Sequence, residues 1–205
     1  MLKFLGKLLN RDLTTPAEPI DTNVSEDEIW EILHPKKKGE LALRKKNLQT
    51  FLQFAASQLN KTECQRLCRV AKRALDDSEN SFEALSDVIF GEEGQRRGKW
   101  VFIQLDWKAR EEIVWQVSEI LSTFDISDRW EPDCEAEFDS VPKALLALSE
   151  WLGGMGLALL HFETGSDSYC SLIVRASDVS NAKELAMAAQ LTLYDHAEFS
   201  RKNNE

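Results

Sequence analysis

The chain has 205 residues, of which 43% are hydrophobic and 29% are charged, and its formal net charge is −10. A chain of this length can bury a core without disulfide bridges, and its composition excludes a disordered, collagen-like or low-complexity protein. No apolar run approaches the roughly 18 residues that a membrane-spanning helix requires.

The negative charge lies in the second half of the chain. Residues 1–98 contain 16 Lys and Arg against 16 Asp and Glu, whereas residues 99–205 contain 9 against 19. An acidic surface repels nucleic acid and attracts basic proteins. We therefore expect a basic protein partner and no nucleic-acid partner, although an acidic loop that serves only solubility gives the same pattern.

Residues 1–24 predict an amphipathic segment followed by a linker. The apolar side chains of residues 1–10 gather on one arc at helical spacing. Such a helix can dock on its own domain or make a weak contact with a membrane surface. The segment lacks the longer apolar stretch and cleavage site of a secretory signal, so we expect a cytoplasmic protein.

Residues 25–90 predict a small helical unit. Thr62 with Gln65, and Asn80 with Glu83, have the spacing of capping boxes. The apolar positions that follow these pairs recur at helical intervals. After a first short helix from Ser25, further helices are expected over residues 40–59, 62–75 and 80–90.

Residues 99–196 predict an α+β domain of order β-α-(β)-α-β-β-α. The connection to it, GEEGQRRG at 91–98, lacks the signatures of a P-loop or a dinucleotide-binding turn. Continuous apolar residues indicate a buried first strand, and a Gly-containing loop indicates a hairpin near the end. The expected elements are a strand at 100–106, a helix at 109–124, a short strand near Trp130, a helix from Ser140, strands at 156–163 and 169–175, and a helix at 178–196.

The hairpin decides the role of its histidine. If the hairpin is centred on Ser166, His161 faces Ser171 on a mixed face and Cys170 lies on the apolar face. A Cys170–His161 dyad is then disfavoured, and no HExxH or GxSxG motif is present. The sequence therefore assigns no catalytic residue and no cofactor, and it favours a protein that is not an enzyme.

Metal binding remains as an alternative. Asp106, Glu111, Glu112 and Asp167 are expected near strand ends, where carboxylates can bind Mg²⁺ or Ca²⁺. Glutamates in a first helical turn and an aspartate in a loop also have ordinary structural roles. The four cysteines form no CxxC pair, so we expect buried thiols and no metal ligand among them.

Tryptophans and acids together indicate a partner-binding surface. Five of the six tryptophans lie between residues 100 and 151, and Trp115 falls on the polar face of its predicted helix. Either the helical unit covers Trp115, or this side chain anchors an interface. The predicted surface comprises Trp107, Glu111, Glu112, Trp115, Glu119, Asp125, Asp128, Trp130, Glu131, Asp133, Glu135, Glu137, Asp167 and Tyr169.

Three segments carry a resemblance to a bacterial family of unknown function. They are QLDWKAREEIVWQVSEIL at 104–121, VPKALLALSEWL at 141–152 and GLALLHFETGSDSY at 156–169. The family pattern is LDW followed by EIxWQ, and then TGxDSY, so the resemblance covers about residues 99–195. It implies no established activity, but proteins of this general kind are similar to small cytoplasmic antidotes of bacterial toxin systems. The matching positions are Asp106, Trp107, Glu112, Trp115, Asp167, Ser168 and Tyr169.

These observations predict a non-enzymatic protein-interaction module. The resemblance implies that this module is an immunity-type inhibitor of a basic toxin. The alternatives are a metal-dependent enzyme that uses the strand-end carboxylates, and a peripheral membrane adaptor that uses residues 1–10.

Overall fold

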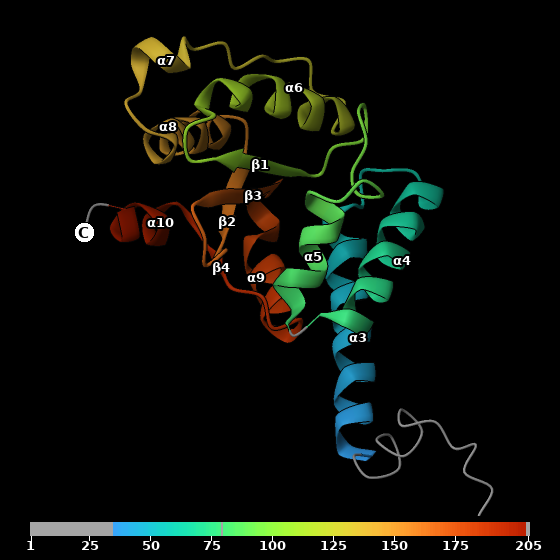
Figure 1. Ribbon diagram of the computed structural model, residues 1–205. Coiled ribbons are helices and arrows are strands. Elements are labelled where there is room, and N and C mark those ends of the chain that lie inside the picture. Colours follow the sequence, from blue (N-terminus) through green and yellow to red (C-terminus); the bar gives the residue numbers. More distant parts are fainter. Residues whose placement is uncertain (1–34, 79, 204–205) are drawn as a thin grey trace, which may run out of the picture. The chain divides into compact units, whose positions relative to one another are not determined.

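The computed structural model describes residues 35–78 and 80–203, which form an α+β fold (Figure 1). The chain divides into two units, Met1–Gly39 and Glu40–Glu205, and the features below belong to the second. The expectations for residues 1–34 lie outside the described residues. No helix in the described part combines the length and apolar content needed to cross a membrane.

The first half of the described chain is helical before the first strand begins. Its elements are α3 (Pro35–Ala55), α4 (Lys61–Asp77), α5 (Ser81–Ile89), β1 (Phe102–Asp106), the 3₁₀ helix η1 (Arg110–Glu112) and α6 (Ile113–Thr123). The second half mixes helices and strands. Its elements are α7 (Cys134–Glu137), α8 (Val141–Gly153), β2 (Leu157–Phe162), β3 (Ser168–Arg175), the 3₁₀ helix η2 (Ala176–Asp178), α9 (Val179–Ala188), β4 (Leu193–Tyr194) and α10 (His196–Asn203).

The four strands form one antiparallel sheet of order β1-β3-β2-β4. His161 pairs with Ser171, and Leu160 pairs with Leu172. This register confirms a hairpin centred on Ser166. His161 and Cys170 therefore point to opposite faces of the sheet, as side chains alternate along a strand.

Both faces of the sheet are covered by helices, because its strands are apolar on both sides. One face, with Phe102 and Leu172, packs against α3, α4, α5 and α9. The other, with Ile103 and Ile173, packs against α6, α8 and α10. The helices of residues 40–90 thus share a core with the sheet inside one compact unit.

Two glutamine side chains complete the outer edge of β1. The Gln95 carbonyl oxygen accepts from the Phe102 N–H at 3.0 Å, and its amide donates to the Phe102 carbonyl at 3.0 Å. Gln116, which is buried, repeats this arrangement with the Gln104 N–H at 2.8 Å and the Gln104 carbonyl at 2.7 Å. An edge strand normally leaves its outward N–H and carbonyl groups without hydrogen-bond partners. Here those of Phe102 and Gln104 are paired with the two glutamine side chains.

The end of the chain differs from the prediction of one helix over 178–196. Gln190 adopts a φ of 60°, which ends α9, and Leu193 and Tyr194 then pair with β2 as a short strand. A separate helix, α10, follows. The alanines up to Ala189 do pack at helical spacing, as predicted. Beyond them the chain leaves the helix, and Leu191 and Leu193 are buried in the core.

Two smaller expectations are also corrected. Asn60 caps α4 by accepting from the Glu63 N–H at 3.0 Å, so Thr62 is not the cap. Asn80 caps α5 by accepting from the Glu83 N–H at 2.8 Å, as predicted. No strand forms near Trp130 in the described chain, because this side chain turns into the core and stacks on Phe138.

Candidate functional site

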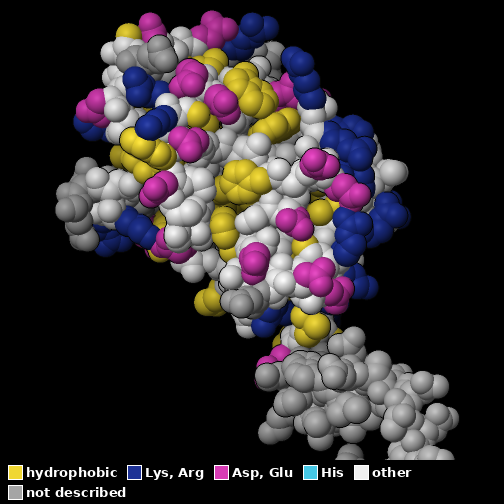
Figure 2. Space-filling model, viewed as in Figure 1, with side chains coloured by type: hydrophobic (Ala, Val, Ile, Leu, Met, Phe, Trp, Pro, Cys, Tyr) yellow, Lys and Arg dark blue, Asp and Glu magenta, His cyan; other side chains and the backbone are white. Residues whose placement is uncertain are grey.

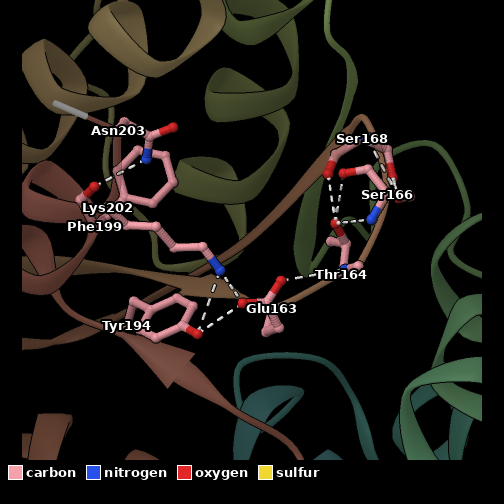
Figure 3. Close-up of polar contacts among 9 residues, drawn as sticks. Glu163, Thr164, Ser166, Ser168, Tyr194, Phe199, Lys202 and Asn203 are labelled. Carbon is pink, nitrogen blue, oxygen red and sulfur yellow. Dashed lines mark hydrogen bonds and ion pairs between the residues drawn. The ribbon is translucent and has the colours of Figure 1, made fainter. Parts of the chain in front are cut away.

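A groove of about 490 Å³ opens where four chain segments meet, and we call it the hairpin groove. It lies between Trp107, which follows β1, and the β2–β3 loop, β4 and α10. Figure 3 shows side chains from the last three of these segments. Its lining is Trp107, Phe162, Glu163, Thr164, Ser166, Asp167, Ser168, Tyr169, Tyr194, Phe199, Lys202 and Asn203. Aromatic rings and hydroxyl groups dominate this lining, a composition that suits binding.

Hydroxyl groups fix the β2–β3 loop beside the groove. The Thr164 hydroxyl donates to the Ser168 carbonyl at 2.8 Å, and the Ser166 and Ser168 hydroxyls lie 2.8 Å apart (Figure 3). Gly165 provides the left-handed turn, with a φ of 64°. The loop therefore holds a defined shape, and it presents Asp167 as an exposed carboxylate at the groove.

Glu163, Tyr194 and Lys202 tie α10 to the hairpin. The Tyr194 hydroxyl donates to Glu163 Oε2 at 2.7 Å, and Lys202 forms an ion pair with the same carboxylate (Figure 3). The Lys202 hydrogen bond, followed by that of Tyr194, lowers the pKa of Glu163. In turn, the hydrogen bonds to Glu163 raise the pKa of Tyr194 and of Lys202. Glu163 is thus held as a carboxylate, which suits a structural tie better than a proton donor.

His161 lies behind this groove and does not line it. Its Nδ1 atom lies 2.9 Å from the Ser171 hydroxyl, and its ring stacks on Phe199 with centroids 3.6 Å apart. Burial, and secondly the nearby His196, lower the pKa of His161 to about 3. The imidazole is therefore neutral at pH 7, and its Nε2 atom has no partner among the described residues.

Two tryptophans of the predicted surface are well exposed. Trp107 is 53% exposed, with the Lys108 ammonium 4.3 Å from its ring centroid. Trp115 is 43% exposed and meets Trp100 edge to face at 4.9 Å. The helical unit therefore leaves much of Trp115 open. Around α6 in Figure 2, hydrophobic and acidic side chains interleave.

Trp115 belongs to a second groove of about 360 Å³, the Trp115 groove. Trp130 also borders it but is only 8% exposed, because it belongs to the core around α6 and α8. Trp130 is thus mainly a packing residue. The lining is Val114, Trp115, Ser118, Glu119, Ser122, Arg129, Trp130 and Glu131.

Glu119 and Glu131 line the Trp115 groove and Asp167 lines the hairpin groove, whereas the other predicted acids line neither. Glu119 is the most confined of the predicted acids, since it accepts from the Gly98 N–H and lies 4.0 Å from Arg97. The side chain of Glu135 lies outside the description. The remaining acids are exposed, in η1 or along the chain from α6 to α8: Glu111, Glu112, Asp125, Asp128, Asp133 and Glu137.

The structure thus divides the predicted surface. Trp107, Asp167 and Tyr169 meet at the hairpin groove, whereas the Trp115 groove brings together Trp115, Glu119, Trp130 and Glu131.

The sequence prediction missed the residues that complete the hairpin groove. They are Glu163, Thr164, Tyr194, Phe199 and Lys202. Most of them come from β4 and α10, which the expected single helix concealed. The alternation of buried Leu191, exposed Thr192 and buried Leu193 was the available signal of a strand.

The strand-end carboxylates do not gather into a metal site. Within residues 35–78 and 80–203, no three His, Cys, Asp or Glu side chains are placed to hold a metal ion together. Asp106, Glu111, Glu112 and Asp167 therefore lack the joint arrangement that the metal alternative requires. Cys64, Cys68 and Cys170 are free thiols.

Residues 26–197 match a family described as a domain of unknown function, DUF6630. No curated protein and no solved structure matches the chain.

Proposed function

The chain belongs to DUF6630, a family defined by a domain of unknown function, and on that premise we propose that it is a non-enzymatic module that binds a basic partner protein. In its specific form, the proposal is an immunity-type inhibitor that sequesters a basic bacterial toxin in the cytoplasm.

One observation carries the proposal: Trp107 and Trp115 are 53% and 43% exposed within the most acidic part of the chain. Residues 106–139 contain eleven Asp and Glu but only three Lys and Arg. Tryptophan is enriched among the residues that dominate binding energy at interfaces. Acidic side chains around such an anchor accelerate association with a basic protein and repel acidic proteins.

The Trp115 groove offers a specific contact for the partner. A lysine or arginine of the partner can lay its aliphatic stem and charge against the indole ring. Its charged end can then reach Glu131, which is exposed on the groove wall. The chain makes such a contact itself, since the Lys108 ammonium lies over the ring of Trp107.

The hairpin groove supports binding rather than catalysis. The Glu163 carboxylate is bonded to Lys202 and Tyr194, and the His161 imidazole is buried and stacked against Phe199. What remains open to a partner is the aromatic surface of Trp107 and the carboxylate of Asp167.

Two double variants test the proposal. Tagged wild type, W107A/W115A and a control, F90A/M187A, are purified from cells that produce the protein, and bound proteins are quantified. Phe90 and Met187 are 48% and 73% exposed but lie outside residues 106–139, so the control removes a similar apolar area. The affinity of each purified variant for the captured protein is then measured at low and high salt.

We expect a stoichiometric basic protein with wild type and with F90A/M187A, and its loss with W107A/W115A. Each tryptophan should contribute about 2 kcal/mol to binding, and the affinity should fall as salt rises. An acidic partner, or a partner that W107A/W115A retains and F90A/M187A loses, would refute the proposal. Urea unfolding of each variant separates a binding defect from a folding defect.

A further inference from the structure

A second surface of the same unit carries the opposite charge. Figure 2 shows Lys and Arg side chains gathered over α4 and the loop beside it. A groove of about 340 Å³ lies there, and we call it the arginine groove. Its lining is Arg66, Arg69, Val70, Arg73, Glu93 and Arg96. We propose that the arginine groove binds a small organic phosphate.

The spacing along α4 places three guanidinium groups on one side of the helix. Arg66, Arg69 and Arg73 are separated by three and four residues, which are neighbours on a helix surface. Arg96 comes from the loop opposite, so the groove draws its positive charge from two segments. The chain as a whole is acidic, hence this clustering is a local feature and not a consequence of composition.

The loop that carries Arg96 is held in a fixed conformation. The Gly94 N–H donates to the Gly91 carbonyl at 2.8 Å, and the Gln95 N–H donates to the Val88 carbonyl at 2.8 Å. A Cβ atom on Gly94 would lie 2.5 Å from the Val88 oxygen, so only glycine fits. The wall of the groove is therefore preorganised, which reduces the entropy cost of binding.

Arg66 anchors α4 to this loop. Its guanidinium donates to both carboxylate oxygens of Glu63, at 3.0 and 2.5 Å, and to the Gly94 carbonyl at 2.7 Å. It also donates to the Glu93 carbonyl. These contacts occupy Arg66 and neutralise Glu63, so the groove's binding capacity rests on the other three arginines.

Those three arginines have donors to offer. Arg69 and Arg96 are exposed and have no hydrogen-bond acceptor among the described residues. Arg73 donates to the Glu93 carboxylate, and both side chains are about two-thirds exposed. Glu93 thus occupies, from within the chain, a position that an external oxyanion could take.

Phosphate is the anion that fits this arrangement. A guanidinium presents paired N–H donors that match two phosphate oxygens, and several converging arginines select a multiply charged group over chloride. The groove volume lies at the small end of ligand sites, which favours a compact ligand. The phosphate could belong to a soluble molecule or to a phospholipid headgroup.

The test uses full-length protein, with inorganic pyrophosphate as the soluble probe. Binding is measured by calorimetry at constant ionic strength for wild type, R69Q/R96Q and R175Q/R201Q. The last variant removes two exposed arginines elsewhere, so it matches the charge change. Sedimentation with phosphatidylcholine vesicles, with and without phosphatidic acid, identifies a lipid source.

We expect R69Q/R96Q to weaken pyrophosphate binding about tenfold or more, while R175Q/R201Q changes it less than about twofold. Binding to phosphatidic acid vesicles that R69Q/R96Q loses would assign the lipid headgroup. Equal weakening by both double variants, or no binding of wild type to either probe, would overturn the proposal.

A carboxylate variant provides an independent readout. Removing the negative charge of Glu93 frees Arg73, so E93Q should strengthen pyrophosphate binding about two- to fivefold. Glu92 is the matched control, because it is the exposed neighbour and does not contact Arg73. Equal effects of E93Q and E92Q would mean that only the overall charge of the loop matters, which contradicts a specific site.

Discussion

Acidification from pH 7 to pH 5 should destabilise this protein through His161. The imidazole is buried between β2 and α10, where it faces Ser171, Phe199, His196 and Asp195. Burial comes first and His196 second in lowering the pKa of His161 from 6.5 to about 3, while Asp195 opposes them. Near pH 6 the His161 imidazole therefore takes up a proton in the unfolded chain but stays neutral in the folded chain.

The sign and size follow from linkage. Since the folded pKa lies below the unfolded one, stability contributed by the neutral imidazole is present above pH 6.5 and is lost as the pH falls. The loss amounts to about 2 kcal/mol between pH 7 and pH 5, and it reaches about 4 kcal/mol near pH 3. Carboxylates with lowered pKa values, such as Glu163, lose their contribution only below the ordinary glutamate value of 4.5.

Urea unfolding of wild type and H161Q at pH 7, 6 and 5 measures this effect. Glutamine retains a hydrogen-bonding group beside Ser171 but does not titrate, so its unfolding free energy should change little over this range. The reasoning is refuted if wild type loses less than about 0.5 kcal/mol, or if H161Q declines as steeply as wild type. Nuclear magnetic resonance of the imidazole should also show a neutral ring at pH 5.

Three further outcomes are expected. Gln116→Leu should lower the unfolding free energy by about 2 kcal/mol, because it leaves backbone groups of β1 unpaired; a loss below about 0.5 kcal/mol in urea titrations would contradict the edge role. Arg66→Met should lower the unfolding free energy by about 3 kcal/mol, because the buried Glu63 carboxylate loses its partner. Urea titration measures this too, and a loss below about 1 kcal/mol would show that Glu63 finds another donor. Burial raises the pKa of both Cys68 and Cys170 to about 12, so iodoacetamide at pH 8 should label them only after unfolding; mass spectrometry that finds rapid native labelling would refute their burial.

Local patterns allowed much of the fold to be predicted. The hairpin register follows from alternating side chains around one short loop, and it placed His161 and Cys170 on opposite faces correctly. The helices of residues 40–90 and the strand before Trp107 follow from apolar spacing in the same way. Each of these depends on residues that are close in sequence.

What could not be predicted depends on contacts between distant segments. The helical pattern up to Ala189 extends far enough to mask β4, whose two residues become a strand only because β2 lies beside them. The partners of Glu163 lie 31 and 39 residues further along the chain. The polar face of α6 showed that Trp115 needs a cover, but only the folded chain shows that Trp100 covers it in part.

The glutamine amides on β1 have a consequence for how this chain can associate. An incoming β-strand would have to displace Gln95 and Gln116 before it could pair with the backbone of Phe102 and Gln104. Strand addition, which drives both peptide capture at sheet edges and amyloid growth, is therefore obstructed at the β1 edge of the sheet.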